Sequence, residues 1–267
     1  MEKLLFFDID GTIVTKIENK FVIPESTRTA LRLLKENGHL CFINSGRAMS
    51  EIDGAIFTLG MDGLVCGCGT HILYHGEELF HQTIPAALRN NLLEDLKKYS
   101  LEWLLEGKDT LYYSTKPYTS RIGGFKQEHR DCYDDIYYKD IPPEDMRELV
   151  FDKFCISLCE GCDFDSFYEK YKGDFSFIDR GDGLYEAVPA GCSKAGGMRF
   201  LMDYFNIPIE DTFAIGDSTN DLPMLDFAGT AIAMGNSSKE ILSHVNYITD
   251  SVEEDGIYNA MVHFGLI

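Results

Sequence analysis

Residues 4–14, LLFFDIDGTIV, place four apolar residues directly before two aspartates, Asp8 and Asp10. An unbroken apolar run is typical of a strand that is buried on both faces of a parallel sheet. Two like charges at the end of such a strand repel each other, so they do not stabilise it. Ligands of open parallel sheets bind outside the carboxyl ends of the strands. The stretch therefore predicts an α/β fold with a binding site at the end of its first strand.

The rest of the chain alternates between the patterns of helices and strands, except in its middle. Amphipathic helices are predicted at residues 25–38 and 193–205, and further strands at 39–45, 63–67, 212–217 and 230–235. This alternation is typical of a parallel sheet covered by helices. We therefore predict a Rossmann-like parallel-sheet core that is formed by both ends of the chain.

Residues 83–188 interrupt the alternation. They are richer in aromatic and acidic residues, with helices predicted near 86–98 and 143–150. They also contain strand-like runs at residues 102–107, 110–115, 154–158, 175–179 and 184–188. Strand runs with few helices indicate an α+β module. Prolines mark both edges, at Pro85 and Pro189. We predict a core domain at 1–82 and 189–267, with an inserted α+β cap domain at 83–188.

Charge and hydropathy limit the classes of partner. The formal net charge is −20, which argues against nucleic acid or an acidic membrane surface, because both require a cationic surface. No run approaches the ~18 apolar residues of a membrane span, and acidic residues follow the first methionine too soon for a signal peptide. We expect a cytoplasmic protein that is a monomer or a weak homo-oligomer and binds neither nucleic acid nor membrane.

The eight cysteines are expected to be reduced thiols in such a protein. The spacing Cys155-x3-Cys159-x2-Cys162 does resemble a run of iron–sulfur ligands. Cys155, however, lies within a predicted strand, so a cluster or a zinc site is the less favoured alternative.

Four polar clusters stand out against this framework. They are Asp8-x-Asp10-Gly11-Thr12, Ser45-Gly46-Arg47, Ser193-Lys194 and Gly216-Asp217-x-x-Asn220-Asp221. Each cluster alone has a structural explanation, such as a turn or a helix cap. Three of them follow predicted parallel strands, however, and the ends of parallel strands meet at one edge of the sheet. We therefore predict that they converge on one site.

A divalent cation would explain so many carboxylates in one place. Mg²⁺ prefers carboxylate and carbonyl oxygens and also bridges to phosphate oxygens. The side chains of Asp8 and Asp217 are candidate ligands, and the backbone carbonyl of Asp10 is a third, because the chain turns there. Together with Lys194, the cation would let a phosphate approach an acidic protein.

As a set, these motifs resemble those of the haloacid dehalogenase-like phosphatases. The resemblance rests on DIDGT (8–12), the serine of NSGR (44–47), the lysine of GCSKAG (191–196) and GDSTND (216–221). Their order, with an insertion between the second and third motifs, resembles the Cof-type subfamily with a C2-class cap. The resemblance covers both halves of the core, whereas the cap is matched only by its position and length.

The resemblance implies a role for each residue of the motifs. Asp8 would be the nucleophile that forms an aspartyl-phosphate, and Asp10 the general acid and base. Ser45 would donate a hydrogen bond to the phosphoryl group, and Lys194 would neutralise charge. The remaining roles are metal binding by Asp8, Asp10 and Asp217, contact with phosphate or substrate by Gly46, Arg47 and Asn220, and orientation of these groups by Asp221.

The function expected is that of a Mg²⁺-dependent phosphatase acting on a small phosphorylated metabolite, with sugar phosphates as the first candidates. A sugar phosphomutase and a phospholigand-binding protein without turnover are the alternatives. The candidate substrate contacts in the cap are Trp103, Tyr112, Tyr113, Arg121 and Lys126, although aromatic residues of a small sheet often serve only in packing.

Overall fold

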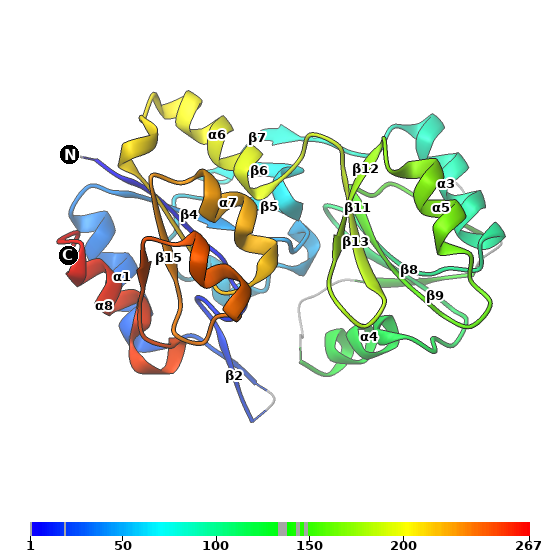
Figure 1. The fold of residues 1–267 in the computed structure, drawn as a ribbon, viewed down its shortest axis with the longest axis horizontal. Helices are drawn as coiled ribbons and strands as arrows, with labels where there is room; N and C mark the ends of the chain where they lie inside the picture. The colour runs from blue at the N-terminus through cyan, green and yellow to red at the C-terminus, as the bar shows by residue number, and fades with distance from the viewer. Residues whose placement is uncertain (1, 19, 133–137, 143–144, 147–148) are drawn as a thin grey trace. The chain divides into compact units, whose positions relative to one another are not determined.

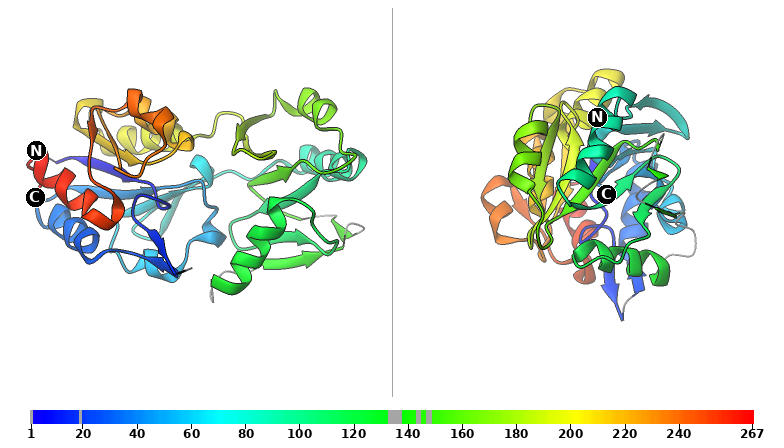
Figure 2. Two further views of the ribbon diagram at one scale, coloured as in Figure 1. Left: turned by 60° about the horizontal axis from the view of Figure 1, so that its bottom comes forward. Right: turned by 90° about the vertical axis from the view of Figure 1, so that its right-hand side faces the viewer.

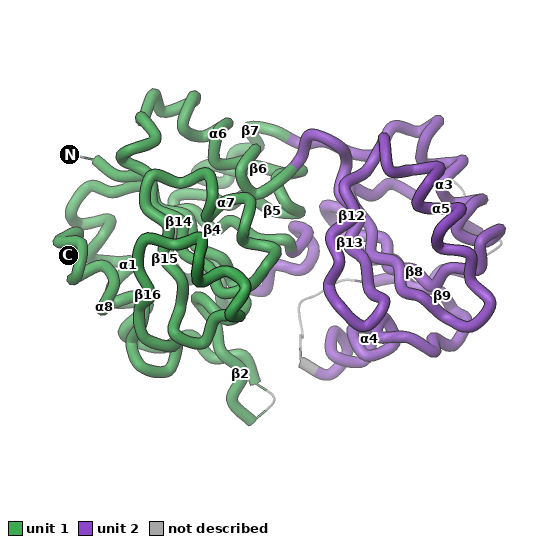
Figure 3. The backbone as a smooth tube through the Cα atoms, in the orientation of Figure 1, with its two compact units in different colours: residues 1–46, 54–80, 193–267 green, residues 47–53, 81–192 purple. Residues whose placement is uncertain are grey.

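A computed structural model describes the chain apart from residues 1, 19, 133–137, 143–144 and 147–148. The chain divides into two compact units (Figure 3). Unit 1 comprises Met1–Gly46, Gly54–Phe80 and Ser193–Ile267, and unit 2 comprises Arg47–Asp53 and His81–Cys192. Unit 2 thus contains the whole of the predicted insertion, residues 83–188, and also the segment Arg47–Asp53, which the prediction assigned to the core domain.

Unit 1 is built around a sheet with the strand order β16-β15-β14-β1-β4-β5-β6-β7 in the described part of the chain (Figure 1). The strands are β1 (Leu4–Phe7), β4 (Leu40–Asn44), β5 (Gly63–Cys66), β6 (His71–Tyr74), β7 (Glu77–His81), β14 (Thr212–Gly216), β15 (Thr230–Ala233) and β16 (Tyr247–Ile248). Neighbours from β16 to β5 pair in parallel, and β6 runs antiparallel to β5. This arrangement confirms the predicted α/β fold with a parallel-sheet core.

Helices cover both faces of this sheet. They are α1 (Glu25–Glu36), α2 (Gly54–Phe57), α6 (Lys194–Phe205), α7 (Leu222–Phe227) and α8 (Gly256–His263). Successive residues of a strand face opposite sides. Leu4 and Phe6 therefore share one face, where they belong to the same core cluster as Met198 of α6 and Met224 of α7. Helices α1 and α8 contact each other and lie on the opposite face (Figure 2).

Every residue of β1 is fully buried, as the unbroken apolar run predicts. Its register matters for the site, because Phe7 pairs with Ile43 of β4 and with Ile215 of β14. The carboxyl ends of these three strands are therefore level with one another. A small antiparallel hairpin, β2 (Thr15–Ile17) and β3 (Lys20–Val22), follows β1 and was not predicted.

Unit 2 has a sheet of its own, with the strand order β10-β9-β8-β11-β13-β12. Its strands are β8 (Glu102–Glu106), β9 (Leu111–Ser114), β10 (Tyr138–Ile141), β11 (Lys153–Ser157), β12 (Phe175–Asp179) and β13 (Leu184–Pro189), and its helices are α3 (Ala86–Lys98), α4 (Arg121–Cys132) and α5 (Phe164–Tyr171). All five strand-like runs of the sequence are strands here, and the helix predicted near 86–98 is α3. The helix predicted near 143–150 lies partly outside the described residues, and β10, α4 and α5 were not predicted.

The two faces of this second sheet have separate cores. Residues of α3 and α5 share a cluster with Phe154, and Ile122 of α4 shares another with Tyr113. Trp103 and Tyr113, two of the candidate substrate contacts, are 4% and 0% exposed and belong to these cores, and their contact with substrate stays a prediction. In the described part of the chain, no helix has the length and apolar character needed to cross a membrane.

Candidate active site

The proposed catalytic aspartates lie at the ends of neighbouring strands of unit 1. Asp8 follows β1 directly, and Asp217 follows β14, which pairs with β1 in parallel. The turn after β1 requires Gly11 for two reasons. Its φ is +74°, which favours glycine, and a Cβ atom there would lie 2.2 Å from Oδ2 of Asp217. The glycine therefore lets the chain turn closely around Asp217.

Lys194 joins the two sides of the site. It opens α6, where Ser193 caps the helix by accepting a hydrogen bond of 2.9 Å from the amide of Gly196. Its ammonium group is almost fully buried and donates to Oδ1 of Asp8 at 2.6 Å and to Oδ1 of Asp221 at 2.5 Å. Burial opposes this charge, but the two carboxylates outweigh burial and raise the pKa of Lys194. The lysine is therefore held in its charged form.

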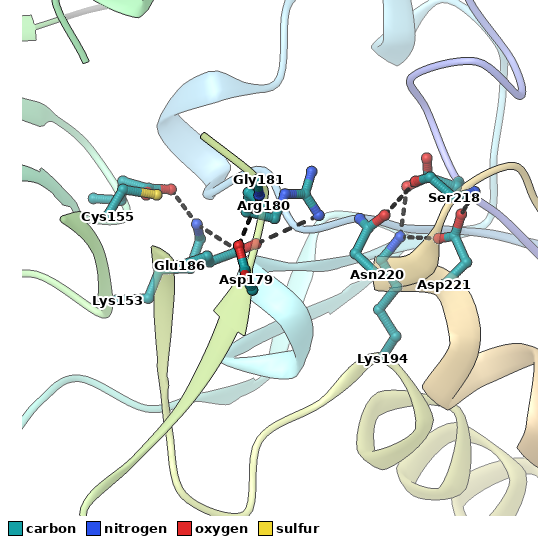
Figure 4. A network of polar contacts seen from close by, with 12 residues as sticks. Lys153, Cys155, Asp179, Arg180, Gly181, Glu186, Lys194, Ser218, Asn220 and Asp221 are labelled. Carbon is teal, nitrogen blue, oxygen red and sulfur yellow. Dashed lines mark hydrogen bonds and ion pairs between the residues drawn. The ribbon is translucent and has the colours of Figure 1, made fainter. Parts of the chain in front are cut away.

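Asp221 shapes the loop that carries Asp217. Its Oδ2 accepts hydrogen bonds from the backbone amides of Asp217, at 2.9 Å, and Ser218, at 3.0 Å. Asn220 is also buried, and its Oδ1 accepts a hydrogen bond from the hydroxyl of Ser218 (Figure 4). The carboxylate of Asp221 thus fixes the turn and orients Lys194 at the same time.

Three carboxylates gather at this point, and Lys194 forms ion pairs with two of them, Asp8 and Asp221. Oxygens of Asp8, Asp217 and Asp221 lie within 4.8 Å of one another. Burial and the neighbouring Asp221 raise the pKa of Asp8 to about 8, although Lys194 opposes the shift. Burial and Asp221 likewise raise the pKa of Asp217 to about 7. Oδ1 of Asp217 is buried and accepts no hydrogen bond from the residues described. A hard divalent cation such as Mg²⁺ fits this set of oxygen donors.

Fewer direct contacts define the positions of the other predicted site residues. Asp10 is exposed in the turn after β1, two residues from Asp8, and its charge contributes to the raised pKa of Asp8. Ser45 is buried, and its backbone is held by Val65 and Cys68. Ser45 and Gly46 end the first segment of unit 1.

Arg47 belongs to unit 2, where its guanidinium donates to the carbonyl of Glu51 at 3.3 Å and lies 3.6 Å from the carboxylate of Asp53. The described contacts therefore assign Arg47 a structural role within unit 2. Its predicted contact with substrate stays a prediction.

Two asparagines support the site and were missed in the sequence. Asn44, which is fully buried at the end of β4, donates to the carbonyl of Lys194 at 3.1 Å. Asn236 donates to the carbonyl of Gly11 at 2.8 Å and accepts from the amide of Val252. Asn44 ends strand β4, and Asn236 follows strand β15. A polar residue at the carboxyl end of a parallel strand is the sequence signal that could have identified both.

A second buried polar cluster, also missed, lies in unit 2. The ammonium group of Lys153 on β11 contacts the carboxylates of Glu106 on β8 and Glu186 on β13, and all three residues are buried (Figure 4 draws Lys153 and Glu186). The thiol of Cys155 donates to Glu106 at 3.1 Å, whereas that of Cys159 donates to the carbonyl of Ser100. Cys155 and Cys159 thus bond to different groups, and the aspartates above are the only group of three or more possible metal ligands found among the residues described. The alternative of an iron–sulfur or zinc site is therefore not supported.

Similarity to known proteins identifies the family of this chain. The sequence profile of the haloacid dehalogenase-like hydrolases matches residues 5–261. The chain belongs to this family. It is 30% identical to YkrA of Bacillus subtilis (strain 168), which carries a provisional phosphatase name, over 99% of this chain and 98% of YkrA.

Two further similar proteins have names or descriptions that include a phosphatase. The chain is 24% identical to 5-amino-6-(5-phospho-D-ribitylamino)uracil phosphatase YitU of the same organism, over 95% of this chain and 94% of YitU. BT1666 of Bacteroides thetaiotaomicron, described among phosphatases of the HAD superfamily, superposes with a TM-score of 0.83 at 26% identity over 100% of this chain and 96% of BT1666. The predicted superfamily and the predicted class of enzyme, a phosphatase hydrolase, are confirmed.

Proposed function

We propose that the chain is a Mg²⁺-dependent phosphatase that hydrolyses a small phosphorylated metabolite through an aspartyl-phosphate on Asp8. The observation that supports this best is the buried ion pair between Asp8 and Lys194 beside the carboxylates of Asp217 and Asp221. A buried carboxylate with a fixed ammonium partner is held in one orientation, as a nucleophile requires.

In the first half of the reaction, an oxygen of Asp8 attacks phosphorus and the bond from phosphorus to the leaving alcohol breaks. Asp10, which is exposed to solvent beside Asp8, gives a proton to the departing oxygen. Ser45 donates a hydrogen bond to the phosphoryl oxygens, and Lys194 balances the negative charge that gathers on Asp8 and on the phosphoryl group.

In the second half, Asp10 accepts a proton from a water molecule as that water attacks phosphorus. The bond from Asp8 to phosphorus breaks, inorganic phosphate leaves, and both carboxylates return to their starting states. Mg²⁺ held by Asp8, Asp217 and the carbonyl of Asp10 would neutralise charge on the phosphoryl oxygens. Asn220, Gly46 and Arg47 remain the candidates for contact with phosphate or substrate.

The substrate class that we favour is a phosphomonoester of a sugar or a sugar-like polyol. The name of YitU specifies a phosphorylated ribityl chain, which is a polyol phosphate, and supports this class for a relative of similar length. Residues 83–188 would then cover the site as a cap and select the group attached to the phosphate.

The first test is hydrolysis of p-nitrophenyl phosphate with and without Mg²⁺, followed by a panel of phosphorylated metabolites. We expect Mg²⁺-dependent release of phosphate and a preference for sugar or polyol phosphates. Binding of phosphate esters without any release would favour a phospholigand-binding protein. Transfer of phosphate between positions of one sugar, with little free phosphate, would favour a phosphomutase.

A further inference from the structure

Two cysteines lie at the ends of a tight turn between β11 and α5 in unit 2. The turn is Cys159-Glu160-Gly161-Cys162, and the amide of Cys162 donates to the carbonyl of Cys159 at 3.2 Å. Gly161 has φ +78°, whereas Glu160 is not among the residues with positive φ, as in a type II turn with glycine at its third position. Such a turn brings the first and last Cα atoms within about 7 Å of each other.

The geometry of the turn allows a bond between the two sulfur atoms with little movement of the backbone. The amide nitrogen of Cys159 lies 3.4 Å from Sγ of Cys162, so that sulfur already sits over the first residue of the turn. Disulfides join cysteines whose Cα atoms are about 4.4–6.8 Å apart, which overlaps the span of the turn. The thiol of Cys159 donates to the carbonyl of Ser100 at 3.1 Å, and rotation of this side chain would bring it toward Cys162.

Exposure separates this pair from most of the other cysteines. Cys159 and Cys162 are partly exposed, whereas Cys41, Cys66, Cys68 and Cys155 are buried. A small oxidant can therefore reach the turn, and oxidation of cysteine follows exposure as well as thiolate character. The turn belongs to unit 2, whereas the proposed catalytic aspartates belong to unit 1.

We propose that Cys159 and Cys162 are a redox-active dithiol that closes to an intramolecular disulfide by exchange with a low-molecular-weight disulfide. In the first step, the thiolate of one cysteine attacks a sulfur of the small disulfide, whose S–S bond breaks and releases one small thiolate. In the second step, the other cysteine attacks the protein sulfur of the mixed disulfide and releases the second small thiolate. The two cysteines lose two electrons and two protons, and the small disulfide is reduced to two thiols.

The order of the two steps follows from the surroundings of Cys159. Burial, with Cys162 adding to it, raises the pKa of Cys159, which leaves less of its thiolate at neutral pH. The thiol of Cys159 also donates a hydrogen bond to the carbonyl of Ser100, which holds its proton in place. We therefore expect Cys162 to make the first attack and the neighbouring Cys159 to resolve the mixed disulfide.

The test treats the folded full-length protein with oxidised glutathione in the presence of EDTA, blocks the remaining thiols and measures the intact mass. We expect a loss of two hydrogen atoms per chain without a retained glutathione, and peptide fragmentation should place the bond between residues 159 and 162. Dithiothreitol should reverse the change. Cys159→Ser should instead retain one glutathione on Cys162.

Cys192→Ser is the matched control, because Cys192 is also partly exposed and lies outside the turn. This variant should close the disulfide at the rate of the wild type. Full blocking of both Cys159 and Cys162 as free thiols after treatment would overturn the proposal. So would separate glutathione adducts on both residues that never resolve, or closure of a disulfide with a different cysteine.

Discussion

At the scale of single residues, Lys194 is the residue on which the site depends most. It is 1% exposed and donates to two carboxylates that are themselves buried. A buried ion pair is costly to form, but removal of one partner is more costly, because a buried charge is left without compensation. The same lysine therefore supports the folding of unit 1 and the proposed reaction.

Replacement of Lys194 with methionine should lower the free energy of unfolding by about 3–5 kcal/mol, since Asp8 and Asp221 would lose their common partner. Urea unfolding measures this change. The control is Lys239→Met, because Lys239 is exposed and should change stability little. Equal stability of the two variants would contradict the role assigned to Lys194.

Replacement of Asp8 with asparagine should abolish turnover while the protein stays folded. The amide has nearly the same shape but is a poor nucleophile, so the rate should fall on the order of 10⁴-fold or more. Hydrolysis of p-nitrophenyl phosphate and circular dichroism together measure this outcome. Asp203→Asn, at an exposed position of α6, is the control that should keep full activity. Turnover within tenfold of the wild type would remove Asp8 from the role of nucleophile.

At the scale of elements, the turns after the parallel strands position the site. The turn after β1 approaches Asp217 so closely that only glycine fits at position 11. The loop after β14 is closed by Asp221, and a Cβ atom on Gly216 would lie 2.6 Å from Cγ of that aspartate. The strands therefore bring their carboxyl ends side by side, and Gly11 and Gly216 allow the chain to approach Asp217 and Asp221 closely.

Replacement of Gly11 with alanine should therefore impair both stability and Mg²⁺ binding. Gly38→Ala is a matched control, because Gly38 also has positive φ, at +81°, but a Cβ atom there would have no neighbour within 4 Å. Both variants should lose about 1–2 kcal/mol to backbone strain. Only Gly11→Ala should displace Asp217 and weaken the response to Mg²⁺, measured as activity against metal concentration. Equal effects of the two substitutions on metal response would contradict the model of the turn.

The contact between α3 and α5 should make the stability of unit 2 depend on pH. Burial raises the pKa of Asp95 on α3, but hydrogen bonds from Lys170 and Tyr171 on α5 outweigh it, so the folded pKa lies below its ordinary value of 3.8. A lowered pKa stabilises the fold above pH 3.8, and this contribution is lost as the pH falls through the folded pKa.

Urea unfolding of wild type and Asp95→Asn across pH 2–7 tests this prediction. The variant should be less stable near neutral pH, and the difference should shrink as the pH falls below 3.8. Glu94→Gln is the control, because Glu94 is exposed on the same helix. A difference that stays constant over the whole range would show that the interaction does not depend on ionisation of Asp95.

At the scale of the whole molecule, the chain passes between the two units after Gly46, Asp53, Phe80 and Cys192. The segment Arg47–Asp53 is held within unit 2 by the hydroxyl of Ser50, which donates to the carbonyl of Gly107 at 2.7 Å, and by Glu51, whose carboxylate lies 3.7 Å from His129. The segment Arg47–Asp53, which begins two residues after Ser45, thus belongs to the unit that contains the predicted insertion. The role of that insertion as a cap stays a prediction.

Mg²⁺ should stabilise the folded protein as a whole, because a ligand that binds only the folded state shifts the unfolding equilibrium. We expect the melting temperature to rise with Mg²⁺ concentration, EDTA to reverse the rise, and activity to follow the same titration. Asp217→Asn should abolish the shift, whereas Asp203→Asn should retain it. Full activity in excess chelator, or a shift unaffected by Asp217→Asn, would contradict the proposed metal site.

The sequence by itself determined the α/β core, the five strand runs of the insertion and the four polar clusters. Apolar runs and periodicity are local properties, and parallel strands necessarily bring their carboxyl ends to one edge. For this reason Asp8, Lys194 and Asp217 could be assigned to one site before any contact was known.

Only the tertiary structure decided the contacts between segments that lie far apart in the chain. It showed that Asn44 supports Lys194, that Cys155 turns away from Cys159, and that Lys153 is buried between two glutamates. It also assigned Arg47–Asp53 to unit 2. These features depend on the register of neighbouring strands and on which face of a sheet each helix covers. Neither is encoded in a local pattern, because a shift of one residue along a strand turns every side chain to the opposite face.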